Sequence, residues 1–430
     1  YYEERGQGKR NCEIDRIVQG CTGIRRSTGQ HPGGIIVLPL GEDINSFTPV
    51  QHPANDMTTD IVTTHFDYHS IDHNLLKLDI LGHDDPTIIK MLEDLTGVNA
   101  LNIPLDDEQV LSLFNNTSAL GVTPDDLMGL DLGSLGVPEF GTEFVMQMLR
   151  DTKPKNFSDL VRISGLSHGT DVWLGNARDL IVSGTASVLE TVGCRDDIML
   201  YLIHMGLDPK MSFKIMEAVR KGKVKKGGFQ DGWEDAMRAH EVPDWYIDSL
   251  AKIGYLFPKA HAVAYVMMAF RIAWFKVHQP LAFYATFFTV RAKAFDAEYC
   301  CAGIDAVKRK IREIENNKDA TAVEQSLMVT LEVCYEFYLR GFHFDTISIY
   351  DSQATAFKIT DNGLLPPFIS VRGLGETAAL DTVEKRKGKT FISVEEFAAC
   401  CSKLSKTHIE QLKALGAFAG MADTSQITFF

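Results

Sequence analysis

One short segment, Leu-Leu-Lys-Leu-Asp-Ile-Leu, places a carboxylate inside an otherwise apolar strand. Because side chains alternate along a strand, Leu76, Leu78 and Ile80 are expected to face a hydrophobic core. Lys77 and Asp79 then share the opposite face of the strand. A buried aspartate needs an ion pair, hydrogen bonds or a metal ion to compensate it. The segment by itself favours the plainest of these, a lysine–aspartate pair on a solvated sheet face.

The composition is that of a globular protein with several domains. The chain has 430 residues, of which 45% are hydrophobic and 23% are charged, and this balance argues against disorder. The length predicts roughly two to four domains. The longest apolar run, residues 262–270, stops at Arg271, whereas a membrane span needs about 18 apolar residues. We therefore expect no membrane association. Tyr1 is not an initiator methionine, which predicts that the chain is part of a longer polypeptide.

Cysteine usage predicts reduced thiols and a cytoplasmic location. None of the eight cysteines belongs to a Cys-x-x-Cys pair, so the sequence shows no zinc framework. Free thiols in a long chain are typical of the cytoplasm. The net charge of −14 argues against generalised electrostatic binding to nucleic acid, although it allows a local basic surface.

Basic residues are concentrated in four short tracts. The tracts are Arg25–Arg26, residues 220–226, residues 308–310 and residues 385–389. Any one of them could be a helix C-terminus, where cations complement the helix dipole. Four tracts in an acidic chain make an anionic partner more plausible.

The pattern along the chain predicts a mainly helical α+β protein. The first 85 residues combine strand and turn signals, and helical periodicity dominates from Pro86 onward. Residues 261–275 carry an apolar helical stripe that ends before Pro280. Two strand candidates, residues 346–350 and 354–359, precede an Asp-Asn-Gly turn.

The segment Val371-Arg-Gly-Leu-Gly375 fits the turn of a helix-hairpin-helix motif. Two glycines let the backbone turn tightly and approach a phosphate, and the next helix presents amide donors. Such binding is independent of base sequence. A glycine-rich interhelical turn without any ligand is the alternative. The basic tract at 385–389 favours the phosphate-binding interpretation.

The chain ends in Gln-Ile-Thr-Phe-Phe. If this end folded back into a core it would need no further role. As a free terminus, its aliphatic and aromatic side chains would suit docking into an apolar pocket on a partner.

Several long stretches closely resemble the bacterial replicative DNA polymerase III alpha subunits of the PolC type. They are Y-Y-E-E-R-G-Q-G-K-R, R-R-S-T-G-Q-H-P-G-G-I-I-V, N-L-L-K-L-D-I-L-G-H-D-D-P-T, S-G-L-S-H-G-T-D-V-W-L-G-N-A, G-C-R-D-D-I-M and F-P-K-A-H-A-V-A-Y-V-M-M-A. The helix-hairpin-helix turn and the terminal aromatic motif follow in the expected order. The resemblance covers essentially the whole chain and identifies it as the C-terminal portion of such a subunit.

This resemblance implies a role for the strand that contains Asp79. The family's palm resembles the nucleotidyltransferase palm, in which three aspartates hold two Mg²⁺ ions, and Asp79 matches the third aspartate. Lys77 would lie near the primer terminus or the reacting phosphate. The implied reaction is template-directed transfer of a nucleotide from a dNTP to the primer 3′-hydroxyl.

The sequence departs from the family pattern in one respect. The first two catalytic aspartates belong to a Pro-Asp-x-Asp motif, and this chain contains none. They are expected upstream of Tyr1. Because one carboxylate cannot organise two divalent ions, the chain by itself should not polymerise.

The resemblance also divides the chain into four regions. It implies the C-terminal part of the palm at 1–85, the fingers at 86–290, a duplex-binding domain with the helix-hairpin-helix at 291–420, and a sliding-clamp-binding tail at 421–430.

Residue roles follow from the matching motifs. For the incoming nucleotide they are Arg220, Lys221, Lys223, His261 and Tyr265, with Arg195 and His168 as further candidates for which structural roles are equally expected. For duplex DNA they are Gly373, Gly375, Lys385, Arg386 and Lys387. For the clamp they are Gln426, Ile427, Phe429 and Phe430, where Ile427 and Phe429 replace the usual leucines.

The implied partners are primer–template DNA, dNTP, the sliding clamp and other replisome subunits. Two other functions stay open. One is a non-catalytic protein that binds DNA and tethers the clamp, which the missing Pro-Asp-x-Asp motif would favour if Tyr1 were the true start. The other is a helix-hairpin-helix repair nuclease or glycosylase, for which the sequence offers no convincing set of catalytic residues.

Overall fold

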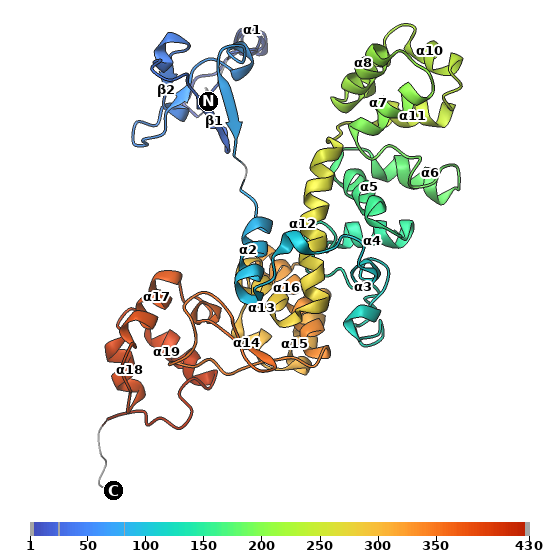
Figure 1. Cartoon of the computed structure of the whole chain (residues 1–430). Helices are drawn as coiled ribbons and strands as arrows, with labels where there is room; N and C mark the ends of the chain where they lie inside the picture. The colour runs from blue at the N-terminus through green and yellow to red at the C-terminus, as the bar shows by residue number, and fades with distance from the viewer. Residues whose placement is uncertain (1–3, 25, 81, 426–430) are drawn as a thin grey trace. The chain divides into compact units, whose positions relative to one another are not determined.

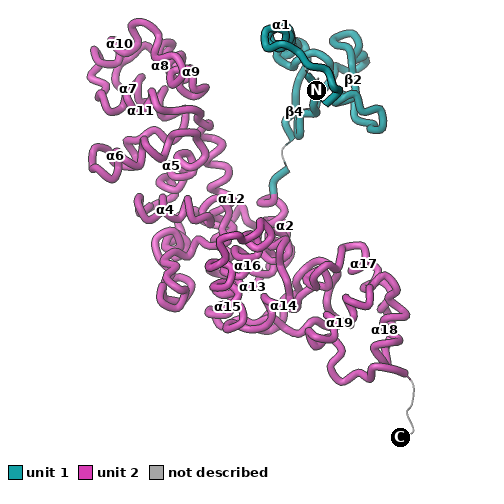
Figure 2. Tube along the Cα trace, turned by 180° about the vertical axis from the view of Figure 1, so that it is seen from behind, with its two compact units in different colours: residues 1–83 teal, residues 84–430 magenta. Residues whose placement is uncertain are grey.

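The computed structural model describes residues 4–24, 26–80 and 82–425. The chain forms two compact units, Tyr1–His83 and Asp84–Phe430, which Figure 2 colours separately. Helices make up most of the regular structure (Figure 1), so the expectation of a mainly helical α+β protein is confirmed.

Unit 1 contains two short antiparallel strand pairs. Its elements are α1 (Asn11–Cys21), β1 (Gly34–Val37), η1 (Ile44–Ser46), β2 (Val50–Gln51), η2 (Pro53–Asn55), β3 (Thr63–Thr64), η3 (Tyr68–Ser70) and β4 (Leu76–Asp79). β1 pairs with β4, and β2 pairs with β3. In the first pair Gly34 lies opposite Asp79 and Ile36 lies opposite Lys77. The predicted strand around Asp79 is therefore present.

The prediction that the apolar side of this strand faces a core is wrong for this chain. Leu76, Leu78 and Ile80 are 60%, 44% and 59% exposed. Ile35 and Val37, on the same side of the neighbouring strand, are exposed as well. We call these five side chains the open sheet face.

The open sheet face reflects the small core of unit 1. Among its described residues only Thr48, Ile71 and Leu75 are buried. A unit of this size normally buries far more apolar surface, and contiguous exposed apolar side chains usually mark a contact with another element or chain.

Unit 2 begins with a helical region. It comprises α2 (Asp85–Thr96), η4 (Ala100–Asn102), α3 (Glu108–Ser112), η5 (Ser118–Leu120), α4 (Glu143–Thr152), α5 (Phe157–His168), the π-helical turn η6 (Trp173–Ala177), α6 (Arg178–Val182), α7 (Arg195–His204), α8 (Pro209–Arg220), α9 (Lys223–Gly227), α10 (Trp233–Ala239), α11 (Asp244–Lys252), α12 (Lys259–His278) and α13 (Pro280–Val290). The chain continues with α14 (Ala297–Cys300), α15 (Ile304–Asn316), α16 (Ala322–Leu339), β5 (His343–Phe344), β6 (Lys358–Ile359), β7 (Gly363–Leu365), η7 (Phe368–Ser370), α17 (Glu376–Lys385), α18 (Val394–Cys400) and α19 (Lys406–Ala414).

Helix α12 joins two hydrophobic cores of unit 2, and it confirms the helix predicted over residues 261–275. It contributes Val266 and Phe270 to one hydrophobic core and Phe275 to a second. It ends at His278, and Pro280 begins α13. By length and composition α12 is the one described helix that could cross a membrane, but much of its apolar surface is buried within the protein.

The strands of unit 2 differ from those predicted. Residues 346–350 form no strand, and of residues 354–359 only Lys358–Ile359 is extended. The Ser348 hydroxyl accepts hydrogen bonds from the backbone amides of Tyr350 and Asp351, which closes a turn instead. The predicted Asp-Asn-Gly turn is present and joins β6 to β7 as an antiparallel pair.

The last three helices close around a third core, which includes Phe368, Phe397, Leu412 and Phe418. All eight cysteines are free thiols, in keeping with the reduced state expected from their spacing.

Candidate functional site

The side chains of Lys77 and Asp79 meet on β4. Lys77 Nζ lies 3.2 Å from Asp79 Oδ1, and the two side chains are 24% and 50% exposed. The ammonium group also lies 5.1 Å from the centre of the Tyr68 ring, where a cation is attracted to the π face. The ion pair predicted from the strand pattern is therefore present, and Asp79 remains accessible to a further cation.

Lys77 also lines a cavity of about 930 Å³ in unit 1. Its polar lining includes His31, Gln51, His65 and Tyr68. His65 Nδ1 lies 2.8 Å from the side-chain oxygen of Gln51, which orients both groups. The cavity therefore offers donors and acceptors beside the Lys77 ammonium.

The His-Pro-Gly-Gly turn packs directly beside the Asp79 strand. The Gly34 amide donates to His31 Nδ1 at 2.6 Å, and Gly34 lies opposite Asp79 in the sheet. A Cβ atom at Gly34 would come within 2.8 Å of the same nitrogen. Position 34 thus requires glycine, because the His31 ring lies too close for a Cβ atom. The hydrogen bond from the Gly34 amide holds that ring next to the strand. The sequence marked this turn but did not indicate that it adjoins Asp79.

The donor set around Asp79 suits a divalent cation only in part. A half-exposed carboxylate is a suitable ligand for a hard cation such as Mg²⁺. A two-ion centre needs several such ligands, and Asp79 is the one carboxylate of that expected set that this chain contains.

In unit 2, two of the predicted triphosphate-binding cations bind one carboxylate. Arg220 binds Glu217 through two nitrogens, and Lys221 Nζ lies 2.9 Å from Glu217 Oε2. These partners, Arg220 first, lower the pKa of Glu217 to about 2. Lys221 and Lys223 line a cavity of about 330 Å³ beside Trp233.

His261 and Tyr265 belong to a ladder of aromatic rings. The Tyr255 ring lies 5.1 Å from that of Phe257, Phe257 stacks on His261 at 5.0 Å, and His261 lies 4.5 Å from Tyr265. Arg220 connects to the start of the ladder, because its carbonyl accepts a hydrogen bond from the Leu256 amide. We call Tyr255, Phe257, His261 and Tyr265 the aromatic ladder.

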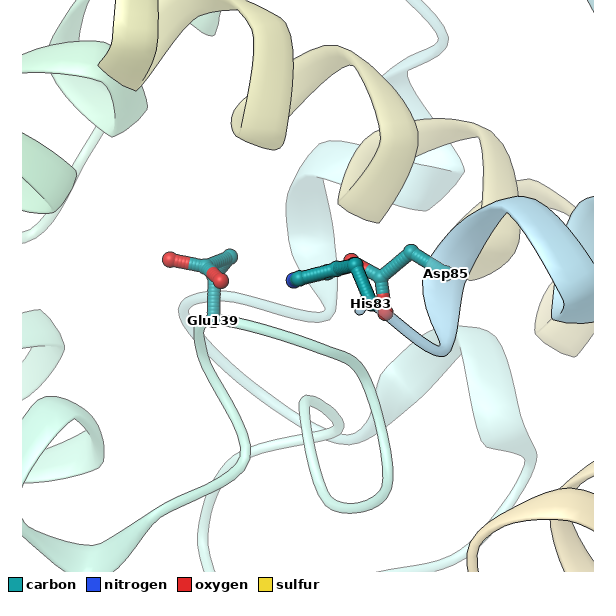
Figure 3. Close-up of side chains that lie close together, drawn as sticks. All are labelled: His83, Asp85 and Glu139. Atoms are coloured by element: carbon teal, nitrogen blue, oxygen red, sulfur yellow. The ribbon is translucent and has the colours of Figure 1, made fainter. Parts of the chain in front are cut away.

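His168 joins the ladder from α5. Its ring centre lies 5.9 Å from that of His261, and its Nε2 lies 2.9 Å from Glu139 Oε2. The hydrogen bond that the His168 imidazole donates to Glu139 raises the pKa of that imidazole. Figure 3 shows Glu139 on its loop and Asp85 at the first turn of α2; an oxygen of each carboxylate lies within 4.8 Å of the other.

The structure therefore groups some predicted nucleotide-binding residues and separates others. The Arg220 backbone is hydrogen-bonded to the segment that carries the aromatic ladder, and the further candidate His168 packs against His261. Lys221 and Lys223 instead line the cavity beside Trp233. Tyr255 and Phe257, just before α12, were not among the residues predicted from the sequence.

The helix-hairpin-helix turn has the expected geometry. Gly373 has φ of +78°, a conformation that favours glycine. Gly375 precedes α17 in extended conformation, and a Cβ atom there would touch nothing within 4 Å. Gly375 is thus not required by internal packing, and its position leaves the start of α17 open to an outside group.

The basic tract lies at the other end of α17. The helix has ten residues, so turn and tract are about 15 Å apart at 1.5 Å per residue. The side chains of Lys385 and Lys387 are exposed. The Arg386 guanidinium instead turns inward, donates to the Ile349 and Ser352 carbonyls, and lies over the Phe368 ring. Arg386 therefore has an internal role, and its predicted contact with DNA stays a prediction.

The predicted clamp-binding residues Gln426, Ile427, Phe429 and Phe430 lie outside the described residues.

Three known domain families match this chain. "Bacterial DNA polymerase III alpha NTPase domain" matches residues 2–82, "Bacterial DNA polymerase III alpha subunit finger domain" matches residues 85–240, and "Helix-hairpin-helix motif" matches residues 341–426. The first match ends one residue before the end of unit 1, and the last contains the Gly373 turn.

Known proteins are similar over the whole chain. The DNA polymerase III PolC-type of Oceanobacillus iheyensis is 55% identical over 98% of this chain, and that of Caldanaerobacter subterraneus is 54% identical over 100% of this chain. The corresponding protein of Clostridium perfringens is 52% identical. This chain spans only 29–30% of the length of these relatives.

Proposed function

Because the chain belongs to the bacterial DNA polymerase III alpha subunit family, PolC type, we propose that it supplies part of the palm, the fingers and a duplex-binding domain to a template-directed DNA polymerase. The observation that carries the proposal is Asp79, which stands half-exposed beside Lys77 on the strand whose sequence matches the family's third catalytic aspartate.

Asp79 is proposed to bind divalent metal together with two carboxylates from elsewhere in the complete polypeptide. Mg²⁺ is the expected ion; when bound, such metals lower the pKa of the primer 3′-hydroxyl and stabilise charge on the leaving pyrophosphate. Lys77, whose ammonium lies at the edge of the polar cavity, would hold the reacting phosphate by charge.

The open sheet face supports an incomplete palm. Its five apolar side chains stand exposed on the strand pair that holds Asp79. The relatives contain more than twice as much additional polypeptide as this chain covers. We propose that further palm elements from that polypeptide cover this face and bring the missing carboxylates to Asp79.

The fingers are proposed to hold the incoming dNTP. The Arg220 backbone joins the segment that carries the aromatic ladder. A nucleotide presents a triphosphate, which a guanidinium can bind, and a base, which aromatic rings can stack on. Lys221 and Lys223 would then act at the adjoining cavity rather than in the same contact.

Duplex DNA is proposed to lie against the C-terminal domain. The Gly373 turn lies at one end of α17, and the exposed Lys385 and Lys387 lie at the other. Because phosphates recur along a duplex, one phosphate would contact the turn and another the lysines. The complete polypeptide is proposed to act in the cytoplasm with other replisome subunits.

Primer extension by the complete polypeptide tests the proposal. With primed template, the four dNTPs and a divalent cation, we expect template-directed incorporation, and we expect none from this chain alone. The alternative is a non-catalytic scaffold that binds DNA and tethers the clamp. Tight duplex binding by the complete polypeptide without any extension would favour that alternative.

The tail is proposed to bind the sliding clamp. Deleting residues 426–430 from the complete polypeptide is expected to shorten products on clamp-loaded DNA by roughly tenfold or more, because aromatic anchors carry most of such a contact. Distributive synthesis without the clamp should be unchanged. Thr428→Ala, at the position between the anchors, is the matched control and should retain product length. Equal product lengths with and without the tail would remove the assignment.

A further inference from the structure

Unit 2 contains a cavity of about 550 Å³ that none of the residues assigned above lines. It lies between α14, α19, β5 and the first residues of the helix-hairpin-helix turn. Small organic ligands typically occupy sites of about 300–1,000 Å³. The cavity is therefore large enough for a small molecule.

Its walls combine apolar surface with an excess of negative charge. Phe344, Ile347 and Leu415 supply apolar surface. The charged lining is four carboxylates, Asp296, Glu298, Asp345 and Glu410, against one guanidinium, Arg372. Four negative charges and one positive charge leave three negative charges around an apolar floor.

These carboxylates differ in how far the protein already satisfies them. Asp345 accepts from Thr360 at 2.6 Å and lies 3.1 Å from His343. Asp296 accepts the Glu298 amide at 3.0 Å. Glu298 and Glu410 are exposed, so their charges are available to a ligand.

Two further features of the wall favour a positively charged donor. Burial raises the pKa of the Asp296 carboxyl, so its charged form would gain from a cation brought beside it. On α19, the Gln411 side chain buries its Oε1 with no hydrogen-bond partner among the described residues. A turn of that amide would present the oxygen to a donor in the cavity.

We propose that this cavity binds a small organic ammonium ion with a short apolar stem. The stem would pack on Phe344 and Ile347, and the ammonium would lie among the Glu298, Glu410 and Asp296 carboxylates. The proposal does not depend on the polymerase assignment, because it uses none of the residues placed in that site.

Three probes of nearly equal shape test the charge preference on the 430-residue chain. They are 2-phenylethylammonium, neutral 2-phenylethanol and anionic 3-phenylpropionate, each titrated by ligand-observed saturation-transfer NMR. We expect the cation to bind with a dissociation constant on the order of 1 mM. The alcohol should bind at least about threefold more weakly and the anion more weakly still.

Single substitutions locate the binding. Glu298→Gln and Glu410→Gln should each weaken the cation about threefold, whereas Glu395→Gln, which makes the same charge change on α18 outside the cavity, should not. Ala414→Phe places a ring into the cavity from an exposed helix position and should abolish binding. Equal affinity for the three probes, binding that survives Ala414→Phe, or no binding of the cation up to about 10 mM would each overturn the proposal.

Discussion

Asp79→Asn in the complete polypeptide is expected to lower the rate of nucleotide addition by about a thousandfold or more, while primer–template affinity changes less than about twofold. An amide lacks the negative charge with which a carboxylate binds a divalent cation, but it keeps the shape of the side chain. The duplex contacts proposed for α17 lie in unit 2, so they do not depend on this carboxylate. Single-turnover incorporation and duplex binding by fluorescence anisotropy measure the two quantities separately.

The fold should survive this substitution. The ion pair with Lys77 is half-exposed, and such pairs contribute roughly 0–1 kcal/mol. Asp60→Asn is the matched control, because it makes the same charge change at an exposed position of unit 1 that is outside the cavity lining. Incorporation near the unmodified rate in the Asp79→Asn protein would remove Asp79 from the catalytic set. An equal loss in the Asp60→Asn protein would show an effect of charge alone.

Lys276→Met is expected to lower the free energy of unfolding of unit 2 by about 3–5 kcal/mol. The Lys276 side chain is completely buried, and its Nζ donates to the Gly133 and Leu135 carbonyls at 2.7 and 2.6 Å. It also lies 2.8 Å from Glu336, which accepts a further bond from Tyr284 at 2.5 Å. The substitution would leave a buried carboxylate without its cation and two buried carbonyls without a donor.

The contact between Lys276 and Glu336 also predicts the stability of the double variant in which both are replaced by methionine. Burial lowers the pKa of Lys276 to about 8, and the neighbouring Glu336 opposes that shift. Removing both charges, as in Lys276→Met combined with Glu336→Met, should cost less than the sum of the two single changes. That difference measures the coupling between the two groups.

Tryptophan fluorescence follows unit 2 alone during denaturation, because all four tryptophans lie in it. Lys90→Met, at an exposed ion pair, is the matched control for Lys276→Met. Its partner Asp94 is one helical turn away on the surface of α2, so the change should cost less than about 0.5 kcal/mol. A loss below about 1 kcal/mol for Lys276→Met would contradict the role given to the buried pair.

Sequence patterns located most elements where local periodicity was strong. The helix over residues 261–275 is present as part of α12, because its apolar stripe and the following Pro280 act over one or two turns. The strand around Asp79 is present for the same reason. The predicted strand at 346–350 failed because the Ser348 side chain competes for the backbone amides and forms a turn.

Side-chain environments were much less predictable. Arg386 stands in a run of lysines and looked like one more surface cation, yet carbonyls more than thirty residues earlier hold it inside. Nothing in the pattern of α12 distinguished Lys276 from a solvated lysine, although Glu336, sixty residues later, holds it in the core. The open sheet face was predicted to be buried because apolar alternation shows which side would be covered, not whether a covering element is present.

The sequence by itself determined the helical class, the glycine turn at Gly373, the strand that carries Asp79 and the family, because each depends on residues within a few positions or on long matching motifs. Only the tertiary structure decided which charges are buried, paired or open. It placed His31 beside the Asp79 strand, joined the Arg220 backbone to the segment that carries the aromatic ladder, and enclosed the acidic cavity between α14 and α19. Burial and pairing arise from segments that are distant along the chain, and no local pattern records which of those segments meet.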